Sequence, residues 1–282
     1  MKAFLPALAV SALLAGAVSA KAQDAPPPQE DWVLTSIPER KATLALAEFT
    51  SGVTLVARCI DGAYDLFITG LPEAPLRATT RDLGLSVGED AALKTTVWTV
   101  GEDRTTAFSR LPAMVARQLA EGGELQIVAQ GPDHRRYRFI MALNPSSTAL
   151  EQTLTACGRP LIDPRDKDTE GDGRETLPAL ARWEIVPRPR FPAPVGGRSP
   201  TEGYAVLSCG AENDGRLVNC QIESEWPRGY GLGREALRSV DRARLRLSDE
   251  AASAGRRLED GIIVFSVSFR TVSYTHLRAH ET

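Results

Sequence analysis

The four cysteines are the residues whose type and spacing most clearly predict chemistry. Cys209 and Cys220 flank Asp214-Gly215, which lies between two β-rich runs. Asp-Gly in that setting favours a hairpin with a two-residue type I′ turn, because both central residues of such a turn need positive φ. Counting outward from this turn places Cys209 opposite Cys220, and opposed positions of an antiparallel pair lie within the span of a disulfide. We therefore predict a Cys209–Cys220 bridge.

Cys59 and Cys157 form the second predicted pair. Four cysteines allow three pairings, and the hairpin favours the pairing that leaves Cys59 with Cys157. In the chain-entropy model the loop of about 100 residues closed by this bridge is worth about 4–5 kcal/mol, against about 3 kcal/mol for the short loop. Both bridges imply an oxidising compartment. Four free buried thiols are the alternative, which such a compartment disfavours.

One acidic run imitates a calcium site. Asp166-x-Asp168-x-Glu170 resembles the start of an EF-hand loop. That loop requires a bidentate glutamate at position 12, where this chain has Leu177, and position 9 is the cation Arg174. We interpret the run as a solvated acidic linker and expect no metal site there.

A histidine pair in the tail imitates a second metal site. His276-x-x-x-His280 has the spacing of two ligands on one helical face. It lies in residues 271–282, which match one reading frame of a sequencing-library adapter, and we exclude that tail as an artefact. His134 is then the single histidine of the chain, which leaves little material for zinc or histidine acid–base chemistry.

Two patterns near the carboxyl end could suggest enzymatic chemistry. Gly229-x-Gly231-x-Gly233 follows a strand and opens a helix, but its third glycine comes one residue early for a dinucleotide loop and no βαβ repeat surrounds it. Glu223 and Glu225 are two apart on a strand, so we expect them to share one solvated face. With no Gly-x-Ser-x-Gly motif and every cysteine bonded, we expect no enzyme and no cofactor.

The amino terminus predicts export. Met1-Lys2 supplies a short positive region, residues 4–18 are an apolar run, and small residues surround Ala20. This order is that of a secretory signal peptide over residues 1–22, and its apolar run is shorter than the roughly 20 residues of a membrane span. An uncleaved membrane anchor is the alternative. The net charge of −3 gives no basic face for nucleic acid.

The elements divide into two expected domains of an α+β fold. A linker at 23–38 precedes a β-rich, disulfide-bonded domain at 39–164, and an acidic and proline-rich linker at 165–200 precedes a domain at 201–270 that combines an antiparallel sheet with one helix. The expected strands cover 42–49, 53–59, 64–69, 94–100, 125–129, 135–143, 204–207, 217–224 and 262–269. The expected helices cover 112–120, 148–157 with the capping box Thr148-x-x-Glu151, and 233–244.

Several stretches carry a family resemblance. They are the Phe191-Pro192 lead-in, the hairpin Asp214-Gly215-Arg216-Leu217, the strand 220–225, the helix entry 231–237, the stretch 243–247 and the last strand 262–269. In this order they resemble the carboxy-terminal domain of the energy-transducer TonB family. Residues 49–157, which are β-rich and end in an alanine-leucine helix with a cysteine, resemble exported proteins of the invasion-associated locus B type.

The TonB resemblance implies binding by β-augmentation, in which an extended partner segment adds to an exposed sheet edge. We expect the last strand to offer that edge, with Ile262, Val264, Ser266 and Ser268 on the face open to water or partner. The chain is then an exported periplasmic, non-enzymatic protein-binding module, and its partner is an envelope protein such as an outer-membrane receptor. The alternatives are a membrane-anchored TonB-type energy transducer for outer-membrane transport and an envelope enzyme without a visible motif.

Overall fold

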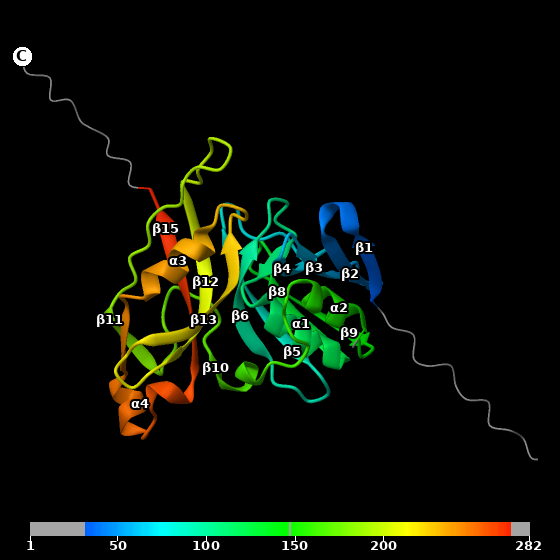
Figure 1. Ribbon diagram of the computed structural model, residues 1–282. Helices are drawn as coiled ribbons and strands as arrows, with labels where there is room; N and C mark the ends of the chain where they lie inside the picture. Colours follow the sequence, from blue (N-terminus) through cyan, green and yellow to red (C-terminus); the bar gives the residue numbers. More distant parts are fainter. Residues whose placement is uncertain (1–31, 147, 272–282) are drawn as a thin grey trace, which may run out of the picture.

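The computed structural model describes residues 32–146 and 148–271. Within them the chain is a mixed α+β structure dominated by β-sheet, as the sequence predicts, with sheets of nine, four and two strands (Figure 1). The predicted leader 1–22 and all but the first residue of the excluded tail lie outside the described residues. No helix in the described part of the chain is long and apolar enough to cross a bilayer.

The nine-stranded sheet is antiparallel, in the order β1-β2-β3-β4-β7-β6-β5-β8-β9. Its strands are β1 (Val33–Ile37), β2 (Ala42–Glu48), β3 (Thr54–Ile60), β4 (Ala63–Thr69), β5 (Thr80–Val87), β6 (Lys94–Val100), β7 (Ala107–Ser109), β8 (Gly123–Gln130) and β9 (Arg136–Leu143). Asp61 and Gly62 join β3 to β4 with φ of 50° and 78°, so the hairpin turn predicted there is confirmed.

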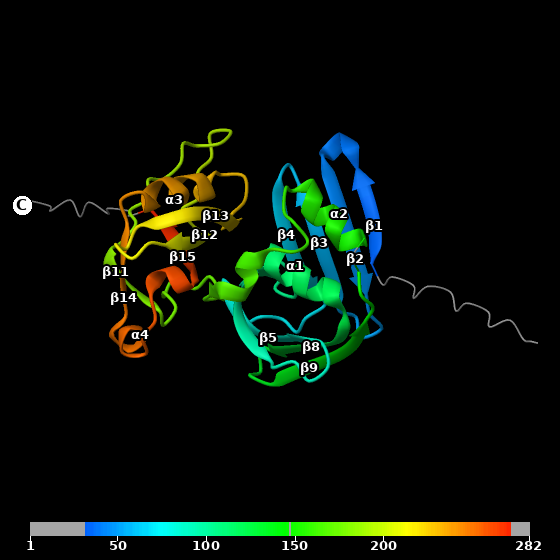
Figure 2. The same cartoon turned by 60° about the horizontal axis from the view of Figure 1, so that its bottom comes forward.

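Two helices complete the first core. Figure 2 shows the large sheet curving around α1 (Pro112–Glu121) and α2 (Thr148–Ala156). Fully buried side chains of this core include Leu55, Leu66, Trp98, Leu119 and Leu150. Pro112 begins α1 as predicted, since its missing N–H would find no helical partner there. Thr148, the predicted cap, is the first residue of α2, and residue 147 before it lies outside the described residues.

The second sheet has the order β10-β15-β12-β13. Its strands are β10 (Thr169–Glu170), β12 (Glu202–Ala211), β13 (Leu217–Trp226) and β15 (Ile262–Arg270), and a separate pair consists of β11 (Ala181–Ile185) and β14 (Arg244–Leu247). The helices are α3 (Leu232–Val240) and α4 (Asp249–Ser253). Leu207, Leu232 and Phe265 are fully buried between α3 and the sheet, which gives this half of the chain its own core.

Several boundaries differ from the prediction. The helix expected over 233–244 ends at Val240, because residues 244–247 alternate in burial and pair with β11. The segment 23–38, for which we expected a linker, contains β1, and the segment 165–200 contains β10 and β11. In each case a strand partner far away in the sequence supplies the hydrogen bonds that local composition cannot reveal.

The two large sheets meet through a small apolar cluster of Leu111, Val206 and Val264. An aromatic series continues this contact: the ring of Phe108 on β7 lies 4.8 Å from that of Phe67 on β4 and 5.3 Å from that of Trp226 at the end of β13. The junction therefore brings β13 of one sheet beside β4 of the other, which positions the site described next.

Candidate functional site

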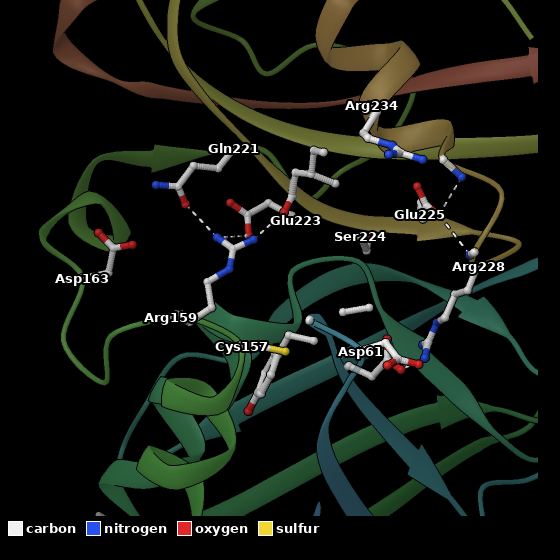
Figure 3. Close-up of a pocket in the computed structure, with 18 of the residues that line it drawn as sticks. Asp61, Cys157, Arg159, Asp163, Gln221, Glu223, Ser224, Glu225, Arg228 and Arg234 are labelled. Atoms are coloured by element: carbon white, nitrogen blue, oxygen red, sulfur yellow. Dashed lines mark hydrogen bonds and ion pairs between the residues drawn. The ribbon is translucent and has the colours of Figure 1, made fainter. Parts of the chain in front are cut away.

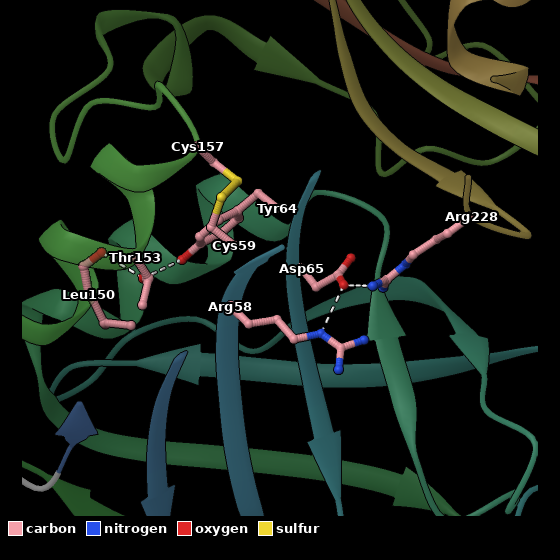
Figure 4. Close-up of a disulfide and its surroundings, with 8 residues drawn as sticks. All are labelled: Arg58, Cys59, Tyr64, Asp65, Leu150, Thr153, Cys157 and Arg228. Atoms are coloured by element: carbon pink, nitrogen blue, oxygen red, sulfur yellow. Dashed lines mark hydrogen bonds and ion pairs between the residues drawn. A yellow bond between two sulfur atoms is a disulfide. The ribbon is translucent and has the colours of Figure 1, made fainter. Parts of the chain in front are cut away.

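Both predicted disulfides are confirmed. Cys59 and Cys157 are bonded with an S–S length of 2.03 Å and a Cα–Cα distance of 5.6 Å, and they tie β3 to the end of α2 (Figure 4). Cys209 and Cys220 are bonded with a Cα–Cα distance of 4.1 Å across the β12–β13 hairpin. Two bridges of this kind indicate an oxidising compartment.

The turn that led to the Cys209–Cys220 prediction differs from the one expected. The Glu212 N–H donates to the Arg216 carbonyl at 2.8 Å, and the Gly215 N–H donates to the Glu212 carbonyl at 2.9 Å. In this turn Gly215 has positive φ, at 83°, whereas Asp214 does not. The loop therefore has three residues, with glycine in the left-handed position, and the two-residue type I′ turn predicted there is wrong.

A bulge restores the register that the longer loop shifts. Gly210 pairs with Val218, yet Ser208 pairs with Gln221, so β13 has one residue more than β12 between these pairs. The extra residue is Asn219, which has a φ of 50°. The bulge and the three-residue loop compensate each other, which is why Cys209 still meets Cys220.

The predicted partner-binding edge of β15 is covered by the chain itself. β10 pairs with β15 at Ile262, and the Ser266 N–H donates to the Arg174 carbonyl at 3.0 Å. Ser268 Oγ donates to a carboxylate oxygen of Glu175 at 2.7 Å. Val264 is 1% exposed and packs in the cluster between the sheets. Residues 169–175 and the other half of the chain therefore cover Ile262 and Val264, whereas Ser266 and Ser268 line a second cavity of about 760 Å³.

The acidic run 166–172 is part of this covering segment and not a solvated linker. Asp166 accepts hydrogen bonds from the Arg117 guanidinium at 2.6 and 2.7 Å. Asp172 accepts from the Val97 N–H at 3.1 Å and from Arg174 Nε at 2.8 Å. Glu170 accepts from Arg256 Nη2 at 2.6 Å, so the carboxylates of the run contact both halves of the protein.

The other outer strand of the second sheet is β13, and its edge lines a cavity of about 810 Å³. Residues 221–225 form one wall (Figure 3). Residues 61–65 form the opposite wall, at the start of β4. β3 pairs with one side of β4 throughout, but β7 pairs with the other side only at Phe67 and Ile68, so the described residues place no strand on that side at 63–66. Two unpaired strand edges thus border one groove.

Arg159 closes part of the β13 edge. It lies two residues after Cys157, and its guanidinium donates to Gln221 Oε1 at 2.7 Å and to the main-chain carbonyl of Ile222 (Figure 3). The carboxylate of Glu223 is 3.7 Å from the same guanidinium. A side chain therefore supplies the donor that a neighbouring strand would supply to Ile222.

The glycine loop at the end of the groove binds the carboxylate of the chain's own Glu225. That carboxylate accepts the N–H groups of Gly229, Gly231 and Gly233 at 3.1, 3.3 and 2.7 Å. A loop and a helix N-terminus with free N–H groups attract an anion, and here the anion is supplied internally. The position that suggested a nucleotide phosphate is occupied.

The prediction that Glu223 and Glu225 share one face of β13 is wrong. A register shift at Glu223 separates the pairs that Val206 and Leu207 make with β13. Glu223 accepts from Ser208 Oγ at 2.5 Å, on the face toward the first sheet, whereas Glu225 lies opposite Ala205 on the α3 face. The bulge therefore removes the alternation on which the prediction depended.

A charged trio lies at the β4 wall. Asp65, which is buried, accepts from Arg58 Nε at 3.1 Å and also pairs with Arg228 (Figure 4). Each guanidinium lies over an aromatic ring, Arg58 over Phe67 at 4.9 Å and Arg228 over Phe108 at 5.0 Å. Burial, together with the charge of Arg58, lowers the pKa of Arg228 to about 9. Two cations share one carboxylate, which leaves a positive excess.

Sequence reasoning missed Arg159 and the Arg58–Asp65–Arg228 trio. Asp65 stands inside an apolar strand, and a carboxylate in such a run must be paired when it is buried. That was the available signal. The predicted Asp61-Gly62 turn places Arg58 opposite Asp65, whereas nothing in the sequence indicates that Arg228, in the loop after β13, approaches it.

Comparisons with models of known families, with curated proteins and with solved structures find no match. The resemblances to TonB carboxy-terminal domains and to locus B proteins therefore stay hypotheses based on the sequence pattern.

Proposed function

We propose that this chain is an exported periplasmic, non-enzymatic protein-binding module that holds an extended segment of an envelope partner by β-augmentation. The segment lies in the groove between β13 and β4. The observation that carries the proposal is the pair of strand edges, 221–225 of β13 and 63–65 of β4, that line opposite walls of one cavity and have no strand paired on the groove side. An extended backbone has donors and acceptors on both sides, so it fits two such edges.

The groove suits a short segment. About five residues of β13 line it, and five extended residues span about 17 Å at roughly 3.4 Å each. Free strand edges are usually blunted by charge or covered. Here residues 169–175 pair with β15 at Ile262, Ile263 and Ser266, whereas no strand of the described residues pairs with the outer side of β13. We therefore propose that the partner segment binds beside β13 and not beside β15.

The rest of the proposal follows the sequence. The leader would direct the chain to the periplasm, where the two disulfides form, and an outer-membrane receptor is a candidate partner. We also propose that the two cores represent two domains, the second of them a TonB-like module.

Site-specific photo-crosslinking tests the proposal. Benzoylphenylalanine is introduced at Ala63, an exposed residue of the groove wall, or at Ala142, an exposed residue of β9 at the far edge of the large sheet. After irradiation of cells that export each variant, mass spectrometry identifies the partner peptide on the crosslink. The proposal expects a crosslink at Ala63 to one defined segment and none at Ala142. Crosslinks at Ala142 alone, or at neither position, contradict it.

A further inference from the structure

The carboxylates that line the groove are largely satisfied within the protein. Glu225 accepts three N–H groups, and Glu223 accepts from Ser208 and faces Arg159. Asp65 is held by two arginines, and Asp163 accepts from the Arg165 N–H at 3.0 Å. These groups need no ligand cation to complete their hydrogen bonds.

Two arginines of the same groove keep donors available. Arg228 must share the carboxylate of Asp65 with Arg58. Arg234 is exposed on the first turn of α3, and it makes no ion pair with any residue that the structure describes. Its guanidinium lies beside Gly231: a Cβ atom added to this glycine would lie only 3.1 Å from Nη2 of Arg234. Arg228 and Arg234 both line the groove, where the Arg228 side chain extends to the β4 wall and Arg234 lies on the α3 side of the glycine loop (Figure 3).

The geometry points to a partner segment with an acidic side chain, aspartate or glutamate, that binds Arg234 at the α3 end of the groove. This inference rests on the proposed function and names the chemistry of the segment. Guanidinium groups bind carboxylates through charge-assisted, often bidentate hydrogen bonds. At the opposite wall Asp61, exposed at the tip of the β3–β4 hairpin, repels a carboxylate. The acidic residue therefore lies at the Arg234 end of the groove.

The probe is a phage-displayed library of random ten-residue peptides, selected on the disulfide-bonded full chain. We expect the selected peptides to compete for one site and to share Asp or Glu at one position. They should also crosslink to the variant that carries benzoylphenylalanine in place of Ala63. Arg234→Glu should weaken these peptides at least tenfold, and selection on this variant should favour Lys or Arg at that position. Arg238→Glu is the matched control, because Arg238 is exposed on the same helix and pairs with Glu235. It should leave affinity unchanged.

The outcomes separate this inference from the proposed function. Peptides that crosslink to Ala63 but show no acidic preference, or that bind Arg234→Glu with unchanged affinity, overturn the acidic segment and leave groove binding in place. Selected peptides that never crosslink to Ala63, or a library that yields no binder, contradict both. Circular dichroism of Arg234→Glu checks that the exposed substitution leaves the fold intact.

Discussion

The guanidinium of Arg159 donates to the main-chain carbonyl of Ile222, in the middle of the unpaired edge of β13. The contact depends on the Cys59–Cys157 bridge, which fixes the chain two residues before Arg159. This partly buried carbonyl is stabilised by the charge-assisted hydrogen bond, so Arg159 stabilises the empty edge. An incoming strand that pairs with Ile222 has to replace this contact.

Arg159→Ala should therefore strengthen the binding of groove peptides several-fold and weaken the fold. We expect the free energy of unfolding to fall by about 1–2 kcal/mol, because Ile222 and Gln221 lose their donor. Calorimetric titration and urea unfolding measure the two effects. The control is Arg138→Ala, which removes an exposed hydrogen bond to Gln126 and should change either quantity little. Weaker peptide binding by Arg159→Ala would show that the arginine belongs to the binding surface.

The two disulfides should differ in their effect on stability. The pairs are 98 and 11 residues apart in sequence. The chain-entropy model then assigns about 4–5 kcal/mol to Cys59–Cys157 and about 3 kcal/mol to Cys209–Cys220. Urea unfolding of the two double Cys→Ser variants measures the difference. Equal losses, or a larger loss for the short loop, would contradict the model for this protein.

Tyr64 should make stability depend on alkaline pH. Burial raises the pKa of Tyr64 to about 12, opposed by its hydrogen bond with Thr153. The unfolded state loses this proton near pH 10, so the contribution is complete below pH 10 and disappears as the pH rises toward 12. From pH 9 to 11 the unfolding free energy of the wild type should fall about 1 kcal/mol more than that of Tyr64→Phe. Tyr137→Phe, which changes an exposed tyrosine of β9, should lose as much unfolding free energy as the wild type. A smaller loss for Tyr137→Phe than for Tyr64→Phe would show that Tyr64 is not the group responsible.

Glu225 should contribute more to stability than a surface glutamate. Glu225→Ala leaves the N–H groups of Gly229, Gly231 and Gly233 without their acceptor, and we expect a loss of about 2–3 kcal/mol. Glu235→Ala removes a surface pair with Arg238 and should cost about 0.5 kcal/mol or less. Thermal unfolding of both variants compares them. Similar losses would mean that the glycine loop does not depend on its internal anion.

The cysteine pairing could be predicted from sequence although the local turn could not. The count that joined Cys209 to Cys220 assumed a two-residue loop, and it succeeded because Asn219 adds a residue that compensates for the third loop position. Strand alternation likewise predicts the strands on either side of Asp61-Gly62, where each local preference agrees with the pairing.

The groove could not be predicted because it depends on contacts between distant segments. Nothing in the sequence near Ser266 indicates that Arg174 will accept its N–H, so the β15 edge was expected to be open. The bulge at Glu223, which separates the two glutamates onto opposite faces, has no glycine or proline to mark it. The meeting of β4 with β13 depends on Phe108 and Trp226, which pack only after both sheets form.

Hydrogen–deuterium exchange on the full chain, with and without a library-selected peptide, tests β-augmentation most directly. If the peptide pairs with both edges, the amides in 221–225 and in 63–66 exchange more slowly when it binds and those in 262–270 are unchanged, since main-chain pairing removes edge amides from solvent. Protection confined to β15 or β9, with exchange in β13 and β4 unaltered, would contradict it.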